Sequence, residues 1–104
     1  NNISDMDDRY GVLFDHLQPK VYKYNDGTSN RLHSGFVAQE VDDALTAAGI
    51  DRSEFAAVCI SNQGTATEQW SLRYDEFIAL NVREIQKLKA RVAELEARLK
   101  ERSI

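Results

Sequence analysis

The sequence is poor in the residues that usually build disulfides and metal sites. It has one cysteine, Cys59, and two histidines, His16 and His33, among 104 residues. A single cysteine excludes an intrachain disulfide, and neither histidine has a second His or Cys at the spacing of metal ligands. We therefore expect no metal and no cofactor. We interpret Cys59, in the apolar run 56–60, as a small buried hydrophobe with no base placed to activate it.

Two further absences limit the partners that the chain can have. The sequence has no apolar run long enough to cross a bilayer and shows no secretory signal. It also lacks a basic cluster, since 17 acidic and 13 basic residues give a net charge of -4. Sequence-independent binding to nucleic acid requires a basic face that displaces counterions from phosphates. We expect neither a membrane nor a nucleic acid as a partner.

The common motifs of catalytic sites are missing as well. The sequence contains no nucleophile elbow, no glycine-rich phosphate loop and no paired-histidine zinc helix. The early carboxylates at positions 5, 7 and 8 crowd the start of a predicted helix, where capping explains them. These absences favour an interaction module over an enzyme that acts on a small molecule. A small hydrolase whose active site has no recognisable motif is a remote alternative.

Residues 1–74 carry the helix signals of a small α+β head. An amphipathic stripe after a cap at Ser4 or Asp5 predicts a first helix that ends before Pro19. A second stripe ends at Gly49, which occupies the usual place of a C-cap glycine. Residues 51–54 resemble a capping box that closes one short turn. The two stripes consist of Tyr10, Leu13, Phe14 and Leu17, and of Val41, Ala44, Leu45 and Ala48.

The same head carries the signals of four strands. The runs 21–24 and 31–37 flank an Asp-Gly turn cluster and predict a β-hairpin, in which Gly35 marks a bulge or a close backbone approach. The run 55–60 and the alternation over 70–74 predict two more strands. We expect the aromatic side chains to form the core of the small sheet and not a stacking platform for a ligand. These aromatic residues are Tyr22, Tyr24, Phe36, Trp70 and Tyr74.

From Asp75 to Ile104 the chain contains no Gly or Pro and follows a heptad repeat. The narrow apolar stripe predicts a parallel coiled coil, because a helix packed on its own domain usually shows a broader stripe. In that register Glu84 reaches Lys89 and Arg91 reaches Glu96 of a neighbouring helix. β-Branched residues at a favour a dimer, but Leu at a and Asn at d blur the rule, so two or three chains both remain open. The a positions are Ile78, Ile85, Val92 and Leu99, and the d positions are Asn81, Leu88 and Leu95.

One segment resembles a known signature. The run Gly35-Phe36-Val37-Ala38-Gln39-Glu40-Val41 is similar to the G-F-(I/V)-A-Q-E-V motif of the intramolecular chaperone domain at the C-terminus of phage endosialidases, tailspikes and tail fibres. Three further segments resemble that family and occur in the same order along the chain as they do there. They are Tyr22-Lys23-Tyr24, the run 72–80 and Ile85-Gln86-Lys87-Leu88. The resemblance spans essentially the whole chain.

The resemblance implies a homotrimeric module that assists folding and trimerisation of an upstream fibre and then cuts itself off with a Ser-Lys dyad. The cutting motif S-D-x-x-L-K-x-x-I matches only Asn1-Asn2-Ile3 at its end, so both catalytic residues are expected before Asn1. Ser4-Asp5 is followed by no lysine until Lys20. We therefore expect no self-cleavage by this chain itself. The parent would be phage-encoded, made in the cytoplasm of a bacterial host and carried in the virion tail.

The sequence leaves two questions open, one about the function of the chain and one about the role of two polar residues. The chain could instead be a plain dimerising or trimerising adaptor without a processing role. Gln39 and Glu40, at a predicted strand-to-helix transition, are either a cap and a structural hydrogen bond or a contact to the fibre or the cutting site.

Overall fold

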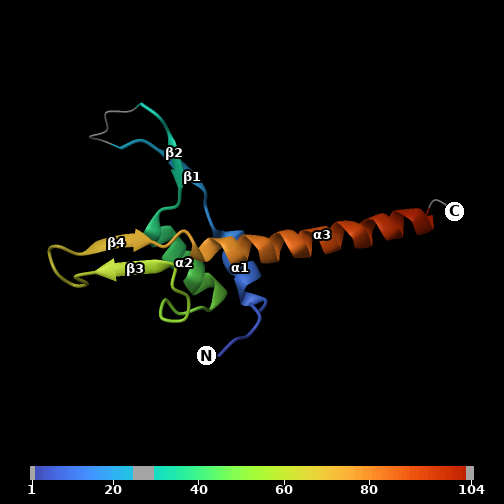
Figure 1. The fold of residues 1–104 in the computed structure, drawn as a ribbon, viewed down its shortest axis with the longest axis horizontal. Coiled ribbons are helices and arrows are strands. Elements are labelled where there is room, and N and C mark those ends of the chain that lie inside the picture. The colour runs from blue at the N-terminus through green and yellow to red at the C-terminus, as the bar shows by residue number, and fades with distance from the viewer. Residues whose placement is uncertain (1, 25–29, 103–104) are drawn as a thin grey trace.

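The computed structural model describes residues 2–24 and 30–102 and shows an α+β chain with three projecting parts (Figure 1). Two short helices form a central body, from which two β-hairpins and one long helix extend. Each hairpin is its own two-stranded antiparallel sheet. The elements are α1 (Arg9–His16), β1 (Lys20–Tyr22), β2 (His33–Gly35), α2 (Ala38–Ala48), β3 (Val58–Ser61), β4 (Gln69–Leu72) and α3 (Glu76–Arg102).

The hydrophobic core lies where α1, α2 and the first turns of α3 meet. Leu13 from α1, Leu45 from α2 and Leu80 from α3 are each at most 1% exposed. Phe55 and Val58, before and at the start of β3, close the core from the hairpin side. Phe77 is also buried here, so the beginning of α3 is part of the head core. The division into a head of residues 1–74 and a coil of residues 75–104 stays a prediction.

The predicted helices are present, but the predicted cap of α1 is wrong. The helix begins at Arg9 after Asp8, well beyond Ser4 and Asp5, and Asp8 makes no side-chain capping bond. Asp7 instead accepts the backbone N–H of Arg9 on Oδ1 at 3.0 Å. The apolar stripe requires helix only from residue 10, and residues 2–8 run as irregular chain before it.

Two predicted signals of the head are confirmed: the C-cap glycine after the second helix and the capping box of the turn that follows it. Gly49 adopts the left-handed conformation, with φ of 71°, after the last residue of α2. This conformation favours glycine because it lacks a Cβ. In the following turn the backbone N–H of Asp51 donates to Glu54 Oε1 at 3.3 Å, as a capping box requires.

The hairpin β1–β2 stands away from the central body (Figure 1). Lys20 pairs with Gly35, Val21 with Ser34 and Tyr22 with His33. The predicted turn cluster at its tip falls on residues 25–29, outside the described residues. In the second hairpin, β3 and β4 pair from Val58↔Leu72 to Ser61↔Gln69, and the strand β3 starts three residues later than predicted.

The predicted aromatic core is wrong for three of its five members. Phe36 and Trp70 pack against the core, but Tyr22, Tyr24 and Tyr74 are 37%, 59% and 47% exposed. The prediction assumed one sheet, whereas the first hairpin forms a separate arm. Its rings pack on one another: Tyr22 lies 5.6 Å from Tyr24 and 5.7 Å from the stacked ring of His33.

The long helix α3 makes the chain far more extended than a globular domain of its length. The radius of gyration is 18.3 Å and the longest axis is 66 Å, against about 13 Å expected for the radius of gyration of a compact chain of this size. Beyond its first turns α3 leaves the head and projects alone (Figure 1). Within the described part, none of the helices combines the length and apolar character of a membrane span.

Candidate functional site

The signature run 35–41 forms the transition from strand β2 to helix α2. Gly35 is the last residue of β2 and Ala38 is the first of α2. Between them Val37 is extended, with φ of -85° and ψ of 125°, and occupies the N-cap position without a side-chain capping bond. Val41 is 1% exposed and donates its N–H to the Val37 carbonyl at 3.0 Å. Much of the motif therefore has a direct structural role.

Gly35 faces the side chain of Tyr74, just before α3. A Cβ on Gly35 would lie 2.6 Å from the Tyr74 hydroxyl oxygen and 3.3 Å from Tyr22 Cε1. That hydroxyl oxygen accepts the backbone N–H of Phe36 at 3.3 Å. The Phe36 ring lies 6.2 Å from Tyr74 and 5.2 Å from Phe77. A close approach at Gly35 is therefore present, but the approaching group is a tyrosine side chain and not another stretch of backbone.

Gln39 and Glu40 lie in the first turn of α2, as predicted, but neither caps it. Gln39 is exposed. Glu40 Oε1 is buried without a hydrogen bond and lies 3.8 Å from Lys20 Nζ of β1, while the side chain as a whole is 36% exposed. The negative charge is favourable at this end of the helix dipole. The structural interpretation of these residues, a cap with a structural hydrogen bond, is wrong about the cap, and the contact of Glu40 to the hairpin arm is an ion pair.

The predicted oligomerisation positions form a continuous exposed stripe along α3. The six apolar members are between 42% and 65% exposed, and Asn81 is exposed as well. The alternative in which this stripe packs on its own head is therefore wrong. Val82, 48% exposed at an e position, widens the stripe near the head. Sequence reasoning missed it, although an apolar residue at e between Ile78 and Ile85 was visible in the heptad register.

A second, shorter stripe fixes α3 to the head. Phe77, Leu80 and Glu84 each precede a stripe position by one residue, which places them about 100° around the helix from it. Phe77 and Leu80 are buried in the core. Arg83, whose side chain is 11% exposed, donates to the Met6 carbonyl at 3.1 Å, pairs with Asp8 at 3.2 Å and also pairs with Glu84. The helix therefore uses one face for the head and leaves the heptad face uncovered.

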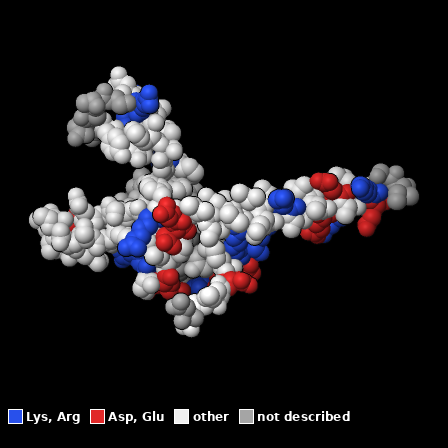
Figure 2. Space-filling view, viewed as in Figure 1, with Lys and Arg blue, Asp and Glu red and all other residues white. Residues whose placement is uncertain are grey.

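The rest of α3 is charged with both signs. Glu94 pairs with Arg91 at 3.0 Å and with Arg98 at 2.6 Å along the same helix. On the face seen in Figure 2, acidic and basic residues alternate along α3 and over the head. The interchain pairs expected for Glu84 and Arg91 stay predictions.

A hollow near the end of α3 has the composition of a coiled-coil packing site. Leu95, Arg98, Leu99 and Arg102 surround a groove of about 300 Å³. They occupy positions d, g, a and d of the repeat. In a coiled coil each apolar knob inserts into a hole made by four residues of the facing helix. The groove can therefore accept a side chain from another helix.

The surroundings of Cys59 differ from the prediction. Arg73 Nε donates to Cys59 Sγ at 3.1 Å, so a basic group does lie beside the thiol. Cys59 pairs with Ser71 across the hairpin, and Arg73 is the diagonal neighbour on the same face. Local sequence could not place a residue fourteen positions away. Cys59 is half-buried, not fully buried.

The histidines have structural contacts. His16 Nδ1 lies 2.8 Å from the Val12 carbonyl one turn earlier, and His33 lies within the aromatic cluster of the first hairpin. Among residues 2–24 and 30–102, no three side chains of His, Cys, Asp or Glu gather as a metal site requires.

Comparison with known families assigns the N-terminal half of the chain. A family model described as chaperone of endosialidase matches residues 1–50. The matched segment is 50 of the 104 residues. The chaperone segment comprises α1, the hairpin arm, the run 35–41 and α2, so the suspected resemblance is confirmed there. No curated protein matches the chain.

Proposed function

We propose that this chain is an intramolecular chaperone that promotes folding and trimerisation of an upstream phage tail fibre or tailspike. The match of residues 1–50 to the chaperone-of-endosialidase family supports the chaperone role. The observation that carries the mechanism is the exposed apolar stripe of α3, from Ile78 to Leu99, on a helix whose remaining exposed surface is rich in charged residues. Exposed apolar surface of this extent indicates an interaction site.

The stripe gathers three chains in a parallel coiled coil, and the attached heads hold the ends of the fibre chains in register. Linking the chains raises the effective concentration of strands that must pair. Trimeric β-fibres depend on contacts that are distant in sequence, which form slowly and expose edges that aggregate. A clamp at one end shortens this search and reduces aggregation.

Release of the chaperone follows folding. In the parent polypeptide a serine and a lysine before Asn1 perform one self-cleavage, in which a neutral lysine takes the proton of the attacking serine. A lysine is neutral at physiological pH when it is partly desolvated. The fibre then loses its folding helper and is trapped kinetically in the folded state. The chaperone uses no cofactor in this scheme.

A plain oligomerisation adaptor is the second candidate. It requires only the exposed stripe of α3, which the adaptor and the chaperone share. The family match of residues 1–50 favours the chaperone, because an adaptor needs no chaperone-like head.

The proposal is tested in a parent fibre that carries the cutting motif. Deleting residues 75–104 should leave the fibre insoluble, because its chains are no longer gathered. Soluble trimers from that deletion would contradict the clamp. Gln39→Ala with Glu40→Ala then separates two roles of the motif: loss of cutting in an intact trimer supports a contact to the cutting site, and loss of the trimer supports a structural role.

A further inference from the structure

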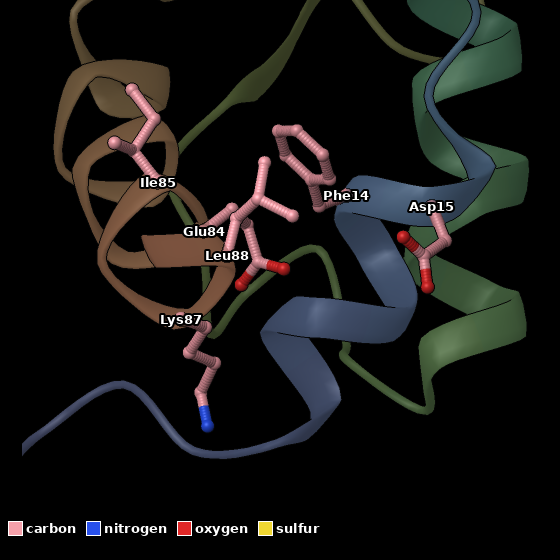
Figure 3. Close-up of a pocket in the computed structure, with 6 residues that line it drawn as sticks. All are labelled: Phe14, Asp15, Glu84, Ile85, Lys87 and Leu88. Atoms are coloured by element: carbon pink, nitrogen blue, oxygen red, sulfur yellow. The ribbon is translucent and has the colours of Figure 1, made fainter. Parts of the chain in front are cut away.

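A cleft of about 320 Å³ lies between α1 and α3, where the head meets the projecting helix (Figure 3). Phe14 and Asp15 line it from α1, and Glu84, Ile85, Lys87 and Leu88 line it from α3. In Figure 3 the Phe14 ring and the Leu88 side chain approach the same space from the two helices.

The floor of this cleft is apolar and open. Phe14, Ile85 and Leu88 are 39%, 56% and 64% exposed. Ile85 and Leu88 are also a and d positions of the heptad stripe. The stripe therefore does not end at the edge of α3 but continues sideways onto the head through Phe14.

The rim of the cleft has an acid that the described chain leaves uncompensated. Lys87 pairs with Asp8 at 3.7 Å, and Glu84 pairs with Arg83. Asp15 has no ion pair within residues 2–24 and 30–102. Lys89, which lies away from this cleft at the e edge of α3, also has no ion pair within those residues.

We propose that α3 of a second copy of this chain fills the cleft, with its e edge lying over Phe14. This inference rests on the parallel assembly of the proposed function. In a parallel coiled coil the g edge of one helix lies beside the e edge of the next. Glu84, on the cleft rim, is a g residue. The neighbouring e edge carries Val82 and Lys89, whose apolar and basic side chains complement Phe14 and Asp15.

The head then contributes contacts to the oligomer interface, in addition to those made by α3. Because Phe14 belongs to α1, the contact fixes the orientation of each head against the neighbouring helix. An apolar Val82 at e, where charged residues are usual, is explained by the apolar surface of the neighbouring head.

Phe14→Ala tests the inference, with Val12→Ala as the matched control. Val12 lies on the same helix and is also 39% exposed, but it does not line the cleft. Sedimentation equilibrium on the full chain should show that Phe14→Ala raises the concentration of half-assembly at least about tenfold. Val12→Ala should change it less than about twofold. Equal effects of the two variants, in a chain that still assembles, would overturn the cleft while sparing the coiled coil.

A photo-crosslinker at position 14 provides a second readout that does not depend on stability. Mixing ¹⁵N-labelled and unlabelled chains should give crosslinked products of mixed mass that map to residues 82–89 of α3. Crosslinks confined to one chain would overturn the cleft contact even if the chain is oligomeric. A chain that stays monomeric would overturn both this contact and the proposed function.

Discussion

The hydroxyl oxygen of Tyr74 lies so close to Gly35 that a Cβ on Gly35 would be only 2.6 Å from it. The same oxygen accepts the backbone N–H of Phe36 at 3.3 Å. Gly35 ends the hairpin arm, and Tyr74 lies two residues before the first residue of α3. One tyrosine therefore joins the signature run 35–41 to the start of α3. The position requires glycine for lack of space and not for a positive φ.

Gly35→Ala should push the Tyr74 ring aside, weaken the bond to Phe36 and destabilise the head by about 1–3 kcal/mol. Tyr74→Phe removes the clashing oxygen, leaving Tyr74 Cζ at an ordinary 3.4 Å. The double variant should therefore be more stable than the sum of the two single changes predicts, by about 1 kcal/mol. Urea unfolding of the four proteins provides this cycle.

Gly11→Ala is the matched control for that cycle. The nearest atom to a Cβ on Gly11 is Arg83 Nη1 at 3.5 Å, and the residue lies inside α1. Alanine should stabilise this helix by about 0.5–1 kcal/mol. Strict additivity between positions 35 and 74 would contradict the steric account of the motif.

Leu80→Ala and Leu88→Ala should destabilise the protein in different ways. Leu80 is fully buried in the head, so its truncation should cost about 2–5 kcal/mol at every protein concentration. Leu88 is 64% exposed in the single chain, so its truncation should matter only through association. Thermal unfolding across a range of protein concentrations separates the two. A concentration-independent loss in Leu88→Ala would contradict the assignment of Leu88 to the interface.

Leu95→Asp should break the coil without unfolding the head, because Leu95 is a d residue far from the core. Ala97→Asp places the same residue on the outer face of the same turn and controls for the lower helix propensity of aspartate. We expect Leu95→Asp to raise the concentration of half-assembly at least about tenfold relative to Ala97→Asp. The same light-scattering signal from both variants would show that the stripe is not the contact surface.

Glu68 should contribute a pH-dependent part of the stability of the second hairpin. The backbone N–H of Gly64 and the Trp70 Nε1–H donate to its carboxylate at 3.0 and 2.7 Å and lower the pKa of Glu68 below its ordinary value of 4.5. A depressed folded pKa gives stability that is present above pH 4.5 and lost as the pH falls through the folded value.

Glu68→Gln isolates this contribution. It should be less stable than the original chain at pH 7 and approach it as the pH falls below 4.5, as measured by thermal unfolding at each pH. Glu101→Gln, near the end of α3, controls for the change in net charge. A stability difference for Glu68→Gln that stays constant from pH 7 to pH 3 would contradict the carboxylate role.

The order of helices and strands could be predicted from the sequence because each element has a local signal. The stripes of α1 and α2, the alternation of Trp70 and Leu72, and the heptads of α3 are all repeats along the chain. Gly49 was predictable for the same reason, since its φ of 71° follows from its place after the last residue of α2.

Contacts distant in sequence could not be predicted in this way. No local pattern shows that Tyr22 and Tyr24 belong to an arm that leaves the core, that Arg73 lies beside Cys59, or that Tyr74 faces Gly35. The cleft beside Phe14 likewise depends on how α1 crosses α3. The candidate surface of α3 was predictable by residue, but its extension onto the head was not.

The central claim is that the exposed stripe of α3 joins three chains. Its most direct test is the solution mass of the chain by light scattering across a hundredfold dilution. The account predicts three times the 11.8 kDa mass of one chain. A mass of two chains would keep the contact surface and favour the adaptor, whereas a monomer at every concentration would contradict the clamp.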